Sequence, residues 1–488
     1  MAKNYVLTNC IPIGYGGLTT ALLNRSAQIS SVSKEPVKIL TFRDREFPKA
    51  VSKHLTERNG LRNGVTVTNI YDWLRENELT CGGMSFDKNK HFYTSLDLNA
   101  PNSTLDIEDG TVLRQLISED NINGWVQVNH LRKDGSPAVI DNRRNGQRCL
   151  IVCDKQGKPH RVFSYSWPFY HAWLDALFGD DHIDIIVDND HEARFLTDYK
   201  RPNVSIIHYF HGTHCNDQGK VLPYAEFVFS RLEHFDLFVF PTFSQCYHAQ
   251  QMFPHYSGFA YVPHALPILT NQKNEVKRER NTFVVASRLE AIKRLDHAVL
   301  AIGAANKTSD GLKLHFLGHG SLIDSLQQQS KMLGDIAIFH GHCSNVPDKL
   351  QKFSFYLLTS ISEGLPVALL EAMQAGCLPI AYNINFGPSD VIIHGVNGWL
   401  VEPGDVQALT KTIEMVSKIP ENELEYMREN ARNTAKQYSI SRVLSDWKMC
   451  KLQARKRRAE KLSLEIWKNK LTTELKDKIR KEMLNETN

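Results

Sequence analysis

Two glutamates eight residues apart, Glu363 and Glu371, stand in the segment SISEGLPVALLEAMQAGCLPIAY. Pro366 suits the first turn of a helix and Gly376 suits its end. The N-terminus of such a helix offers unpaired N–H groups and a positive dipole end, which favour a diphosphate. Glu363, in the preceding loop, could accept hydrogen bonds from sugar hydroxyls, and Glu371, about two turns along, could bind a ribose. Taken alone, the segment fits an ordinary amphipathic helix equally well.

Two cations, Arg288 and Lys293, follow the apolar run TFVVAS and could hold that diphosphate. A sugar that leaves its nucleotide diphosphate builds negative charge on the diphosphate oxygens, so fixed cations there stabilise the transition state more than the ground state. Arg forks onto phosphate oxygens, and Lys supplies a point charge. A solvated Arg and Lys after a strand is the commoner arrangement, and the two downstream glutamates favour the clamp.

Two further groups of residues stand at the ends of apolar runs. The turn Gly14-Tyr15-Gly16-Gly17 follows KNYVLTN and would let the backbone approach a phosphate, although a tight strand-to-helix connection would use the same residues. His208, His211 and His214 end the run VSIIHYF. Zinc requires converging ligands, and no acidic or cysteine partners stand nearby in a metal-binding arrangement, so we predict no metal here. For His214 the alternative is a surface loop position.

The motifs resemble those of family 4 retaining glycosyltransferases. E-G-L-P-V-A-L-L-E is similar to the E-x7-E motif of that family, and S-R-L-E-A-I-K is similar to its donor-phosphate clamp. F-L-G-H-G-S-L (316–322) and H-G-V-N-G-W-L-V (394–401) follow in the order and spacing of the family. The resemblance covers residues 282–447, and the glycine turn fits the N-terminal phosphate loop.

The resemblance implies a UDP-sugar donor, no cofactor and no metal, because cations and a helix N-terminus already cover the diphosphate. Asp188-Asn189-Asp190 matches the metal-binding D-x-D of the other glycosyltransferase fold only superficially, and we expect Asp190 to cap the following helix. Family enzymes carry a histidine near the transferred sugar, for which His211 is the best match and His208 the fallback. The implied catalytic residues are His211, Glu363, Arg288 and Lys293. The implied donor-binding residues are Gly16, Gly17, Arg288, Lys293, Gly364, Leu365 and Glu371.

The elements that must position these residues alternate between apolar strand-like runs and helix-length stretches. This rhythm predicts an α/β protein of the GT-B type, with two Rossmann-like domains that face a cleft. We place the N-terminal, acceptor domain at residues 1–45 and 166–270. The polar segment NQKNEVKRER (271–280) predicts a linker between the domains. With this linker at its start, the domain that binds the nucleotide sugar is predicted at residues 271–448.

A β-rich domain is predicted at residues 46–165, inserted into the first domain. Gly124, Gly135, Gly146 and Gly157 recur every 11 residues, mostly in turn pairs such as Asn145-Gly146, between short β-rich runs. Such spacing is typical of an antiparallel meander. The pattern and the phrase N-F-G-P-S-D-V-I (385–392) resemble poly(glycerol- or ribitol-phosphate) α-glycosyltransferases and the glycosyltransferases of serine-rich adhesins. In that group the insert serves oligomerisation or acceptor docking.

The charge of the chain is concentrated at its end. Residues 449–488 hold 12 Lys and Arg against 6 Asp and Glu, a net +6, so the other 448 residues sum to about −2 of the total +4. This distribution argues against nucleic-acid binding. The sequence of this tail (449–488) predicts a basic amphipathic helix. The helix would either dock on the first domain or lie on an anionic membrane surface. The nine cysteines show no paired spacing, and no apolar run reaches the roughly 18–20 residues of a membrane span. Both features favour a cytoplasmic enzyme, in one alternative peripheral to the inner face of the membrane.

The sequence thus predicts a retaining α-glycosyltransferase, a hexosyltransferase that moves glucose, or as second choice N-acetylglucosamine, from UDP to a polymeric acceptor. The acceptor would be teichoic acid, a glycoprotein or its protein-linked glycan. We also expect a homo-oligomer or a partner complex formed through the insert. The rival interpretations are a glycogen- or sucrose-type enzyme, which the insert disfavours, and a non-catalytic subunit, which has no need of a leaving-group clamp.

Overall fold

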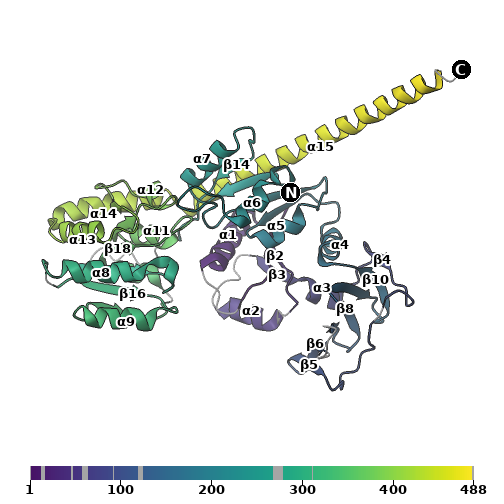
Figure 1. The fold of residues 1–488 in the computed structure, drawn as a ribbon, viewed down its shortest axis with the longest axis horizontal. Helices are drawn as coiled ribbons and strands as arrows, with labels where there is room; N and C mark the ends of the chain where they lie inside the picture. Colours follow the sequence, from purple (N-terminus) through teal and green to yellow (C-terminus); the bar gives the residue numbers. More distant parts are fainter. Residues whose placement is uncertain are drawn as a thin grey trace. The chain divides into compact units, whose positions relative to one another are not determined.

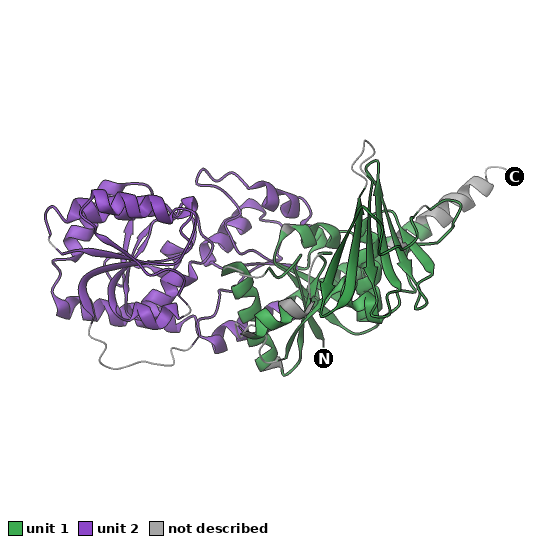
Figure 2. Ribbon diagram, turned by 90° about the horizontal axis from the view of Figure 1, so that it is seen from below, with its two compact units in different colours: residues 1–208, 233–236, 453–488 green, residues 209–232, 237–452 purple. Residues whose placement is uncertain are grey.

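The computed structural model describes residues 2–12, 17–44, 48–57, 64–91, 93–118, 125–267, 278–309, 311–343 and 345–485 (Figure 1). The chain divides into two compact units (Figure 2). Unit 1 comprises residues 1–208, 233–236 and 453–488, and unit 2 comprises residues 209–232 and 237–452. Among the described helices, none combines the length and the apolar character that a membrane crossing needs.

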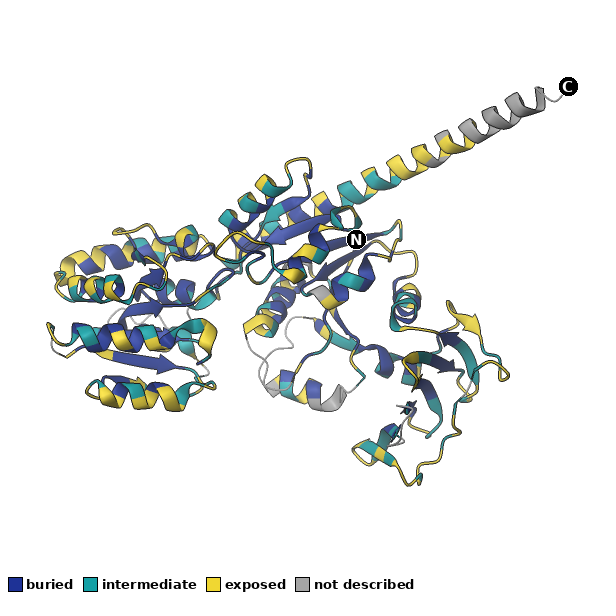
Figure 3. Ribbon diagram, viewed as in Figure 1, coloured by how far each residue is buried: buried dark blue, intermediate teal, exposed yellow. Residues whose placement is uncertain are grey.

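Unit 1 contains a parallel sheet with the strand order β12-β11-β1-β2-β3. Its central strands are apolar and almost wholly buried (Figure 3), as expected when helices cover both faces of a parallel sheet. The strands are β1 (Lys3–Leu7), β2 (Val37–Thr41), β3 (Val65–Asn69), β11 (Ile183–Val187) and β12 (Val204–Tyr209). The helices are α1 (Gly17–Ser33), α2 (Pro48–Glu57), α3 (Ile70–Glu76), α4 (Ser166–Phe178) and α5 (Asp190–Leu196).

Strand β3 lies within the range 46–165 predicted for the insert, yet it pairs in parallel with β2, from Val37 opposite Val65 to Thr41 opposite Asn69. Its sequence, VTVTN, alternates between apolar and polar residues and is only partly buried, because β3 ends the strand order of this sheet. It therefore lacks the continuous apolar run that reveals the central strands. The α/β alternation continues through α3, and the division into domains stays a prediction.

The second sheet of unit 1 is an antiparallel meander, as predicted. Its order is β4-β10-β9-β8-β7-β6-β5, so that β5 to β10 follow one another in sequence and in space. The strands are β4 (Met84–Ser85), β5 (Ser103–Glu108), β6 (Thr111–Ser118), β7 (Val126–Leu131), β8 (Pro137–Arg144), β9 (Gln147–Cys153) and β10 (Pro159–Phe163).

The turn pairs connect these strands as the sequence predicted. Asn145 and Gly146, with φ of 51° and 74°, join β8 to β9, where Arg144 pairs with Gln147. Two residues with positive φ form the turn whose twist matches an antiparallel pair. Gly135 and Gly157 also have positive φ, whereas Gly124 lies outside the described residues.

Unit 2 contains a parallel sheet with the order β17-β16-β15-β18-β19-β20, which confirms the second α/β alternation. Its strands are β15 (Glu279–Ala286), β16 (Lys313–Leu317), β17 (Ala337–Phe339), β18 (Phe353–Leu358), β19 (Leu378–Tyr382) and β20 (Trp399–Val401). Its helices are α8 (Leu295–Ala305), α9 (Ile323–Met332), α10 (Val346–Leu350), α11 (Val367–Gln374), α12 (Pro388–Val391), α13 (Val406–Val416) and α14 (Glu421–Lys436). Unit 2 also holds the parallel strands β13 (Leu237–Phe240) and β14 (Phe259–Tyr261), with α6 (Pro223–Phe229) and α7 (Phe243–Met252).

The basic tail is part of one long helix, α15 (Ile440–Asn485), whose residues from Gln453 onward belong to unit 1. Arg455 Nε donates to Oδ1 of the buried Asp184 at 2.9 Å, and Lys461 Nζ lies 3.3 Å from Oδ1 of the buried Asp236. Arg457 and Arg458 donate to backbone carbonyl oxygens of unit 1. Of the two predicted roles of the tail, docking on the first domain therefore holds for residues 455–461.

Candidate functional site

The predicted clamp and the first glutamate come together in unit 2. Lys293 ends the short 3₁₀ turn Ala291–Lys293, and its Nζ donates to Glu363 Oε1 at 2.5 Å. The same oxygen accepts the Ser360 hydroxyl at 2.6 Å. Both charged side chains are only about a sixth exposed, at 18% and 15%, so solvent screens this pair less than a surface pair. The carboxylate of Glu363 is thereby held in one orientation.

Backbone contacts fix the two loops that carry this pair. Thr359 Oγ1 donates to the Lys293 carbonyl at 2.8 Å, and the Ile361 N–H donates to the Ile292 carbonyl at 2.8 Å. These hydrogen bonds therefore join the turn after β15 to the loop after β18. They follow neighbouring parallel strands, and ligands of open α/β sheets bind where such strands end.

Arg288, the other predicted cation, is exposed and lies in the same turn after β15. The glycines of F-L-G-H-G-S-L pack against this turn. A Cβ on Gly318 would overlap the Ser287 carbonyl oxygen, and one on Gly320 would overlap that of Leu289. These two positions need glycine because backbone occupies the space, so the motif positions the backbone that carries Arg288.

Glu371 lies on α11, which begins at Val367 after Pro366 and ends before Gly376, close to the predicted bounds. Gly376 has a φ of 72°, as expected just past a helix end. Desolvation raises the pKa of Glu371 to about 7. A carboxyl group in this environment gains from donors such as ribose hydroxyls, which favour its ionised form.

Gly364 and His211 meet through their backbones. A Cβ on Gly364 would overlap the His211 carbonyl oxygen, so the E-G-L-P loop packs directly on the loop after β12. Leu365 is buried in the core of unit 2. The His211 ring stacks on His264 at a centroid distance of 5.5 Å. The structure thus brings His211, Gly364 and Glu363 into one continuous region.

The glycine turn is only partly described. Gly16 lies outside the described residues, and Gly17 is the first residue of α1. Gly17 belongs to unit 1, whereas the predicted site residues from His211 onward belong to unit 2. The donor-binding roles of Gly16 and Gly17 stay predictions.

The acidic D-x-D sequence has a structural partner in unit 1. The guanidinium of the buried Arg25 donates to Asp188 Oδ2 at 2.6 Å. The N-cap of α5 is Asn189, whose side chain accepts the Glu192 N–H, so the expectation that Asp190 caps this helix is wrong. The helix begins one residue earlier than the sequence suggested.

The three histidines have different environments. His208 is buried in β12 beside Phe235. The preference for His211 over His208 as the sugar-contacting residue stays a prediction. His214 is fully buried, so the surface-loop alternative is wrong. It lies against His248 and Cys215 and stacks on Phe386 at 5.1 Å. Burial lowers the pKa of His214 to about 3, so its imidazole is neutral.

Asp390 is a positioning residue that the motifs did not single out. Its carboxylate accepts the Ser244 N–H at 2.8 Å and the Ser244 hydroxyl at 2.5 Å, and it also accepts the Gly387 N–H at 3.0 Å. It therefore joins the start of α12 to the start of α7. The only signal in the sequence was its place in N-F-G-P-S-D-V-I, since Ser244 stands 146 residues away.

Comparison with known proteins gives consistent likenesses. Residues 269–434 match the family model "Glycosyl transferases group 1". The poly(glycerol-phosphate) alpha-glucosyltransferase of Bacillus subtilis (strain 168) is 22% identical over 504 residues, covering 91% of this chain and 74% of that protein. The GtfA/B complex structure is similar with a TM-score of 0.72 at 20% identity, covering 93% of this chain and 100% of that chain. A mutant of S. aureus TarM in complex with Fondaparinux, alpha-GlcNAc-glycerol and UDP gives a TM-score of 0.70 at 17% identity, with coverages of 92% and 99%. These likenesses confirm the predicted fold.

Proposed function

Because the chain has the GT-B glycosyltransferase fold, we propose that it is a retaining α-glycosyltransferase of family 4 that moves glucose from UDP-glucose to a polymeric acceptor. N-acetylglucosamine is the second choice of sugar. In the transfer, an acceptor hydroxyl oxygen forms a bond to C1 of the sugar, and the bond from C1 to the diphosphate breaks. The electron pair leaves on UDP, and the hydroxyl proton is released.

The observation that carries this proposal is the junction of Lys293, Glu363, Gly364 and the His211 backbone. Lys293 and Arg288 would neutralise charge on the departing diphosphate together with the N-terminus of α11. Glu371 would bind the ribose, and Glu363 the hydroxyls of the transferred sugar. Leu365 and Gly364 shape the loop between them. No metal or cofactor has a part in this mechanism.

The nature of the acceptor is supported by relatives. The Bacillus subtilis relative is named for poly(glycerol-phosphate) glucosylation, and the TarM structure contains alpha-GlcNAc-glycerol and UDP. We propose a teichoic-acid-type polymer or a glycoprotein as acceptor, with no role for nucleic acid, and a cytoplasmic site of action. GtfA was solved in a complex with GtfB, which supports our proposal that this chain works as an oligomer or with a partner through its insert.

The direct test measures UDP release with a panel of UDP-sugars and acceptors. UDP-glucose, UDP-N-acetylglucosamine and UDP-galactose are each combined with poly(glycerol phosphate), poly(ribitol phosphate) and a serine-rich peptide, with and without attached N-acetylglucosamine. We expect turnover with UDP-glucose and one polymeric acceptor, and a product with an α anomeric proton coupling in NMR spectra. A β-linked product would contradict retention of the anomeric configuration. If no pair of UDP-sugar and acceptor led to UDP release, the proposal that the protein is a glycosyltransferase would be wrong.

A further inference from the structure

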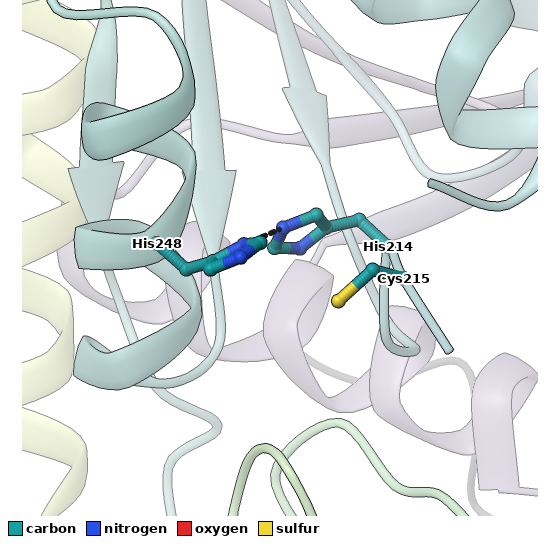
Figure 4. Close-up of side chains that lie close together, drawn as sticks. All are labelled: His214, Cys215 and His248. Atoms are coloured by element: carbon teal, nitrogen blue, oxygen red, sulfur yellow. Dashed lines mark hydrogen bonds between the residues drawn. The ribbon is translucent and has the colours of Figure 1, made fainter. Parts of the chain in front are cut away.

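A cluster of potential metal-ligand side chains, His214, Cys215 and His248, lies in unit 2 (Figure 4). His214 and Cys215 stand in the loop between β12 and α6, and His248 stands on α7. One potential ligand atom from each residue lies within 4.8 Å of the other two. Figure 4 shows the two imidazole rings edge to edge and the thiol of Cys215 beside them.

The protein itself leaves this cluster incompletely satisfied. His214 Nε2 and His248 Nδ1 are 2.8 Å apart, a separation at which two neutral imidazoles share one proton. His214 Nδ1 is buried and has no hydrogen-bond partner among the described residues. Aromatic rings surround His214, including Phe240 at 5.6 Å and Phe386 at 5.1 Å. A buried polar ring in such surroundings is costly unless another ligand compensates.

The sequence predicted no metal at His214, but the structure brings Cys215 and His248 beside it. We propose that these three residues bind a zinc-type cation whose fourth position is open to water or another small ligand. Two imidazoles and a thiolate suit zinc, whereas magnesium and calcium prefer oxygen ligands. Tetrahedral zinc with bonds of about 2.0–2.3 Å needs ligand atoms about 3.3–3.7 Å apart. The potential ligand atoms of the three residues lie within 4.8 Å of one another, so side-chain rotations would close the site.

The cation would act on the loop that carries His211. This loop already has two cross-links within unit 2, because Gln245 Nε2 donates to the Gly212 carbonyl at 2.8 Å and Asn385 Nδ2 donates to that of Asn216 at 2.7 Å. A metal bridge from His214 and Cys215 to His248 would join the same loop to α7 through coordinate bonds. Its role is to fix the loop, and the inference does not depend on which sugar is transferred.

The test uses the full-length protein, stripped of metal and then dialysed against zinc or cobalt. We expect about one equivalent of bound metal and a higher melting temperature with zinc. The cobalt form should show a thiolate-to-metal charge-transfer band, which reports the sulfur ligand without any substitution. Absence of both the bound equivalent and this band in the wild-type protein would overturn the proposal.

Variants then locate the site. Cys215→Ser and His248→Gln should each weaken metal binding by about tenfold or more, since even the loss of a partner behind a ligand has an effect of that size. Cys246→Ser is the matched control, because Cys246 is also buried and lies two residues from His248 on the same helix. Unchanged affinity in both cluster variants, or an equal loss in the control, would refute the assignment. Metal-free melting curves of all the variants show whether each one folds.

Discussion

The ammonium nitrogen of Lys293 lies 2.5 Å from Oε1 of Glu363, although the two residues are 70 positions apart in the chain. In the proposed reaction Lys293 acts on charge that develops only as the diphosphate leaves. Lys293→Ala should therefore reduce kcat by about 10²-fold or more while affinity for the UDP-sugar donor changes far less. Steady-state kinetics and titration with the UDP-sugar give the two quantities. Lys313→Ala, at the exposed start of β16, is the matched control; a kcat within a few-fold of wild type for Lys293→Ala would contradict the clamp.

Glu371 should make UDP binding depend on pH. Its pKa is raised to about 7, so the protein holds this carboxyl protonated below that pH, whereas ribose hydroxyls bind best to the ionised form. UDP affinity should fall about tenfold per pH unit below 7, and binding near neutral pH should release a proton. Calorimetry in buffers of different ionisation enthalpy measures that release. Glu371→Gln should abolish it; proton uptake by the wild type would contradict the assignment.

The raised pKa of Glu371 also makes the stability of the folded protein depend on pH, in a direction that can be predicted. The folded protein keeps the proton of Glu371 up to about pH 7, whereas the unfolded chain loses it near pH 4.5. The native state thus binds more protons between these values, and this residue alone makes stability fall as pH rises from about 4.5 to 7. The difference between Glu371→Gln and wild type in urea midpoint should widen over that interval and stay constant above it. A constant difference throughout would contradict the shift.

Donor chemistry should not require magnesium or manganese. We expect UDP-sugar turnover to persist in excess EDTA during a short assay, because fixed cations stand in place of a metal. A loss that manganese or magnesium restores would refute this prediction. A loss that zinc alone restores would concern the histidine–cysteine cluster instead, since that ligand set does not suit oxygen-seeking ions.

The distal part of α15 is our candidate for membrane contact. Leu464, Ile466 and Trp467 are exposed on it at 51%, 69% and 59%, beyond the stretch that docks on unit 1. A chain that ends at Ser463 keeps Arg455 and Lys461 with their aspartates, so it isolates this part. We expect the full chain, and not the shortened one, to sediment with anionic liposomes. Equal sedimentation of both would refute tail-mediated binding.

The insert should govern assembly and acceptor use, not donor chemistry. Trp125 of the insert is buried and donates to Asn142 Oδ1 at 2.9 Å, so it offers no exposed surface to a partner. The better target is β5, which ends the strand order and exposes Ile107 at 55%. Ile107→Lys should split the assembly in light scattering and weaken polymer transfer, while UDP-sugar hydrolysis without acceptor persists. A monomeric wild type whose transfer ignores this substitution would refute the role.

Motifs within one loop were predictable, whereas contacts between distant loops were not. The glycine turns predicted the meander because a positive φ restricts the residue type. Pro366 and Gly376 predicted the two ends of α11. Strand β3 was missed because an edge strand has no continuous apolar run. The meeting of His214 with His248 was hidden because the two residues stand 34 positions apart on different elements.

The three-part composition of unit 1 has a consequence for synthesis on the ribosome. Asp184 and Asp236 are buried, yet their cationic partners Arg455 and Lys461 are translated more than 200 residues later. A buried carboxylate without its partner is strongly unfavourable. Unit 1 is therefore begun early but completed late, because the nascent chain must emerge as far as Lys461 before these two carboxylates gain their partners. This order departs from the usual N-terminal-first folding of successive domains.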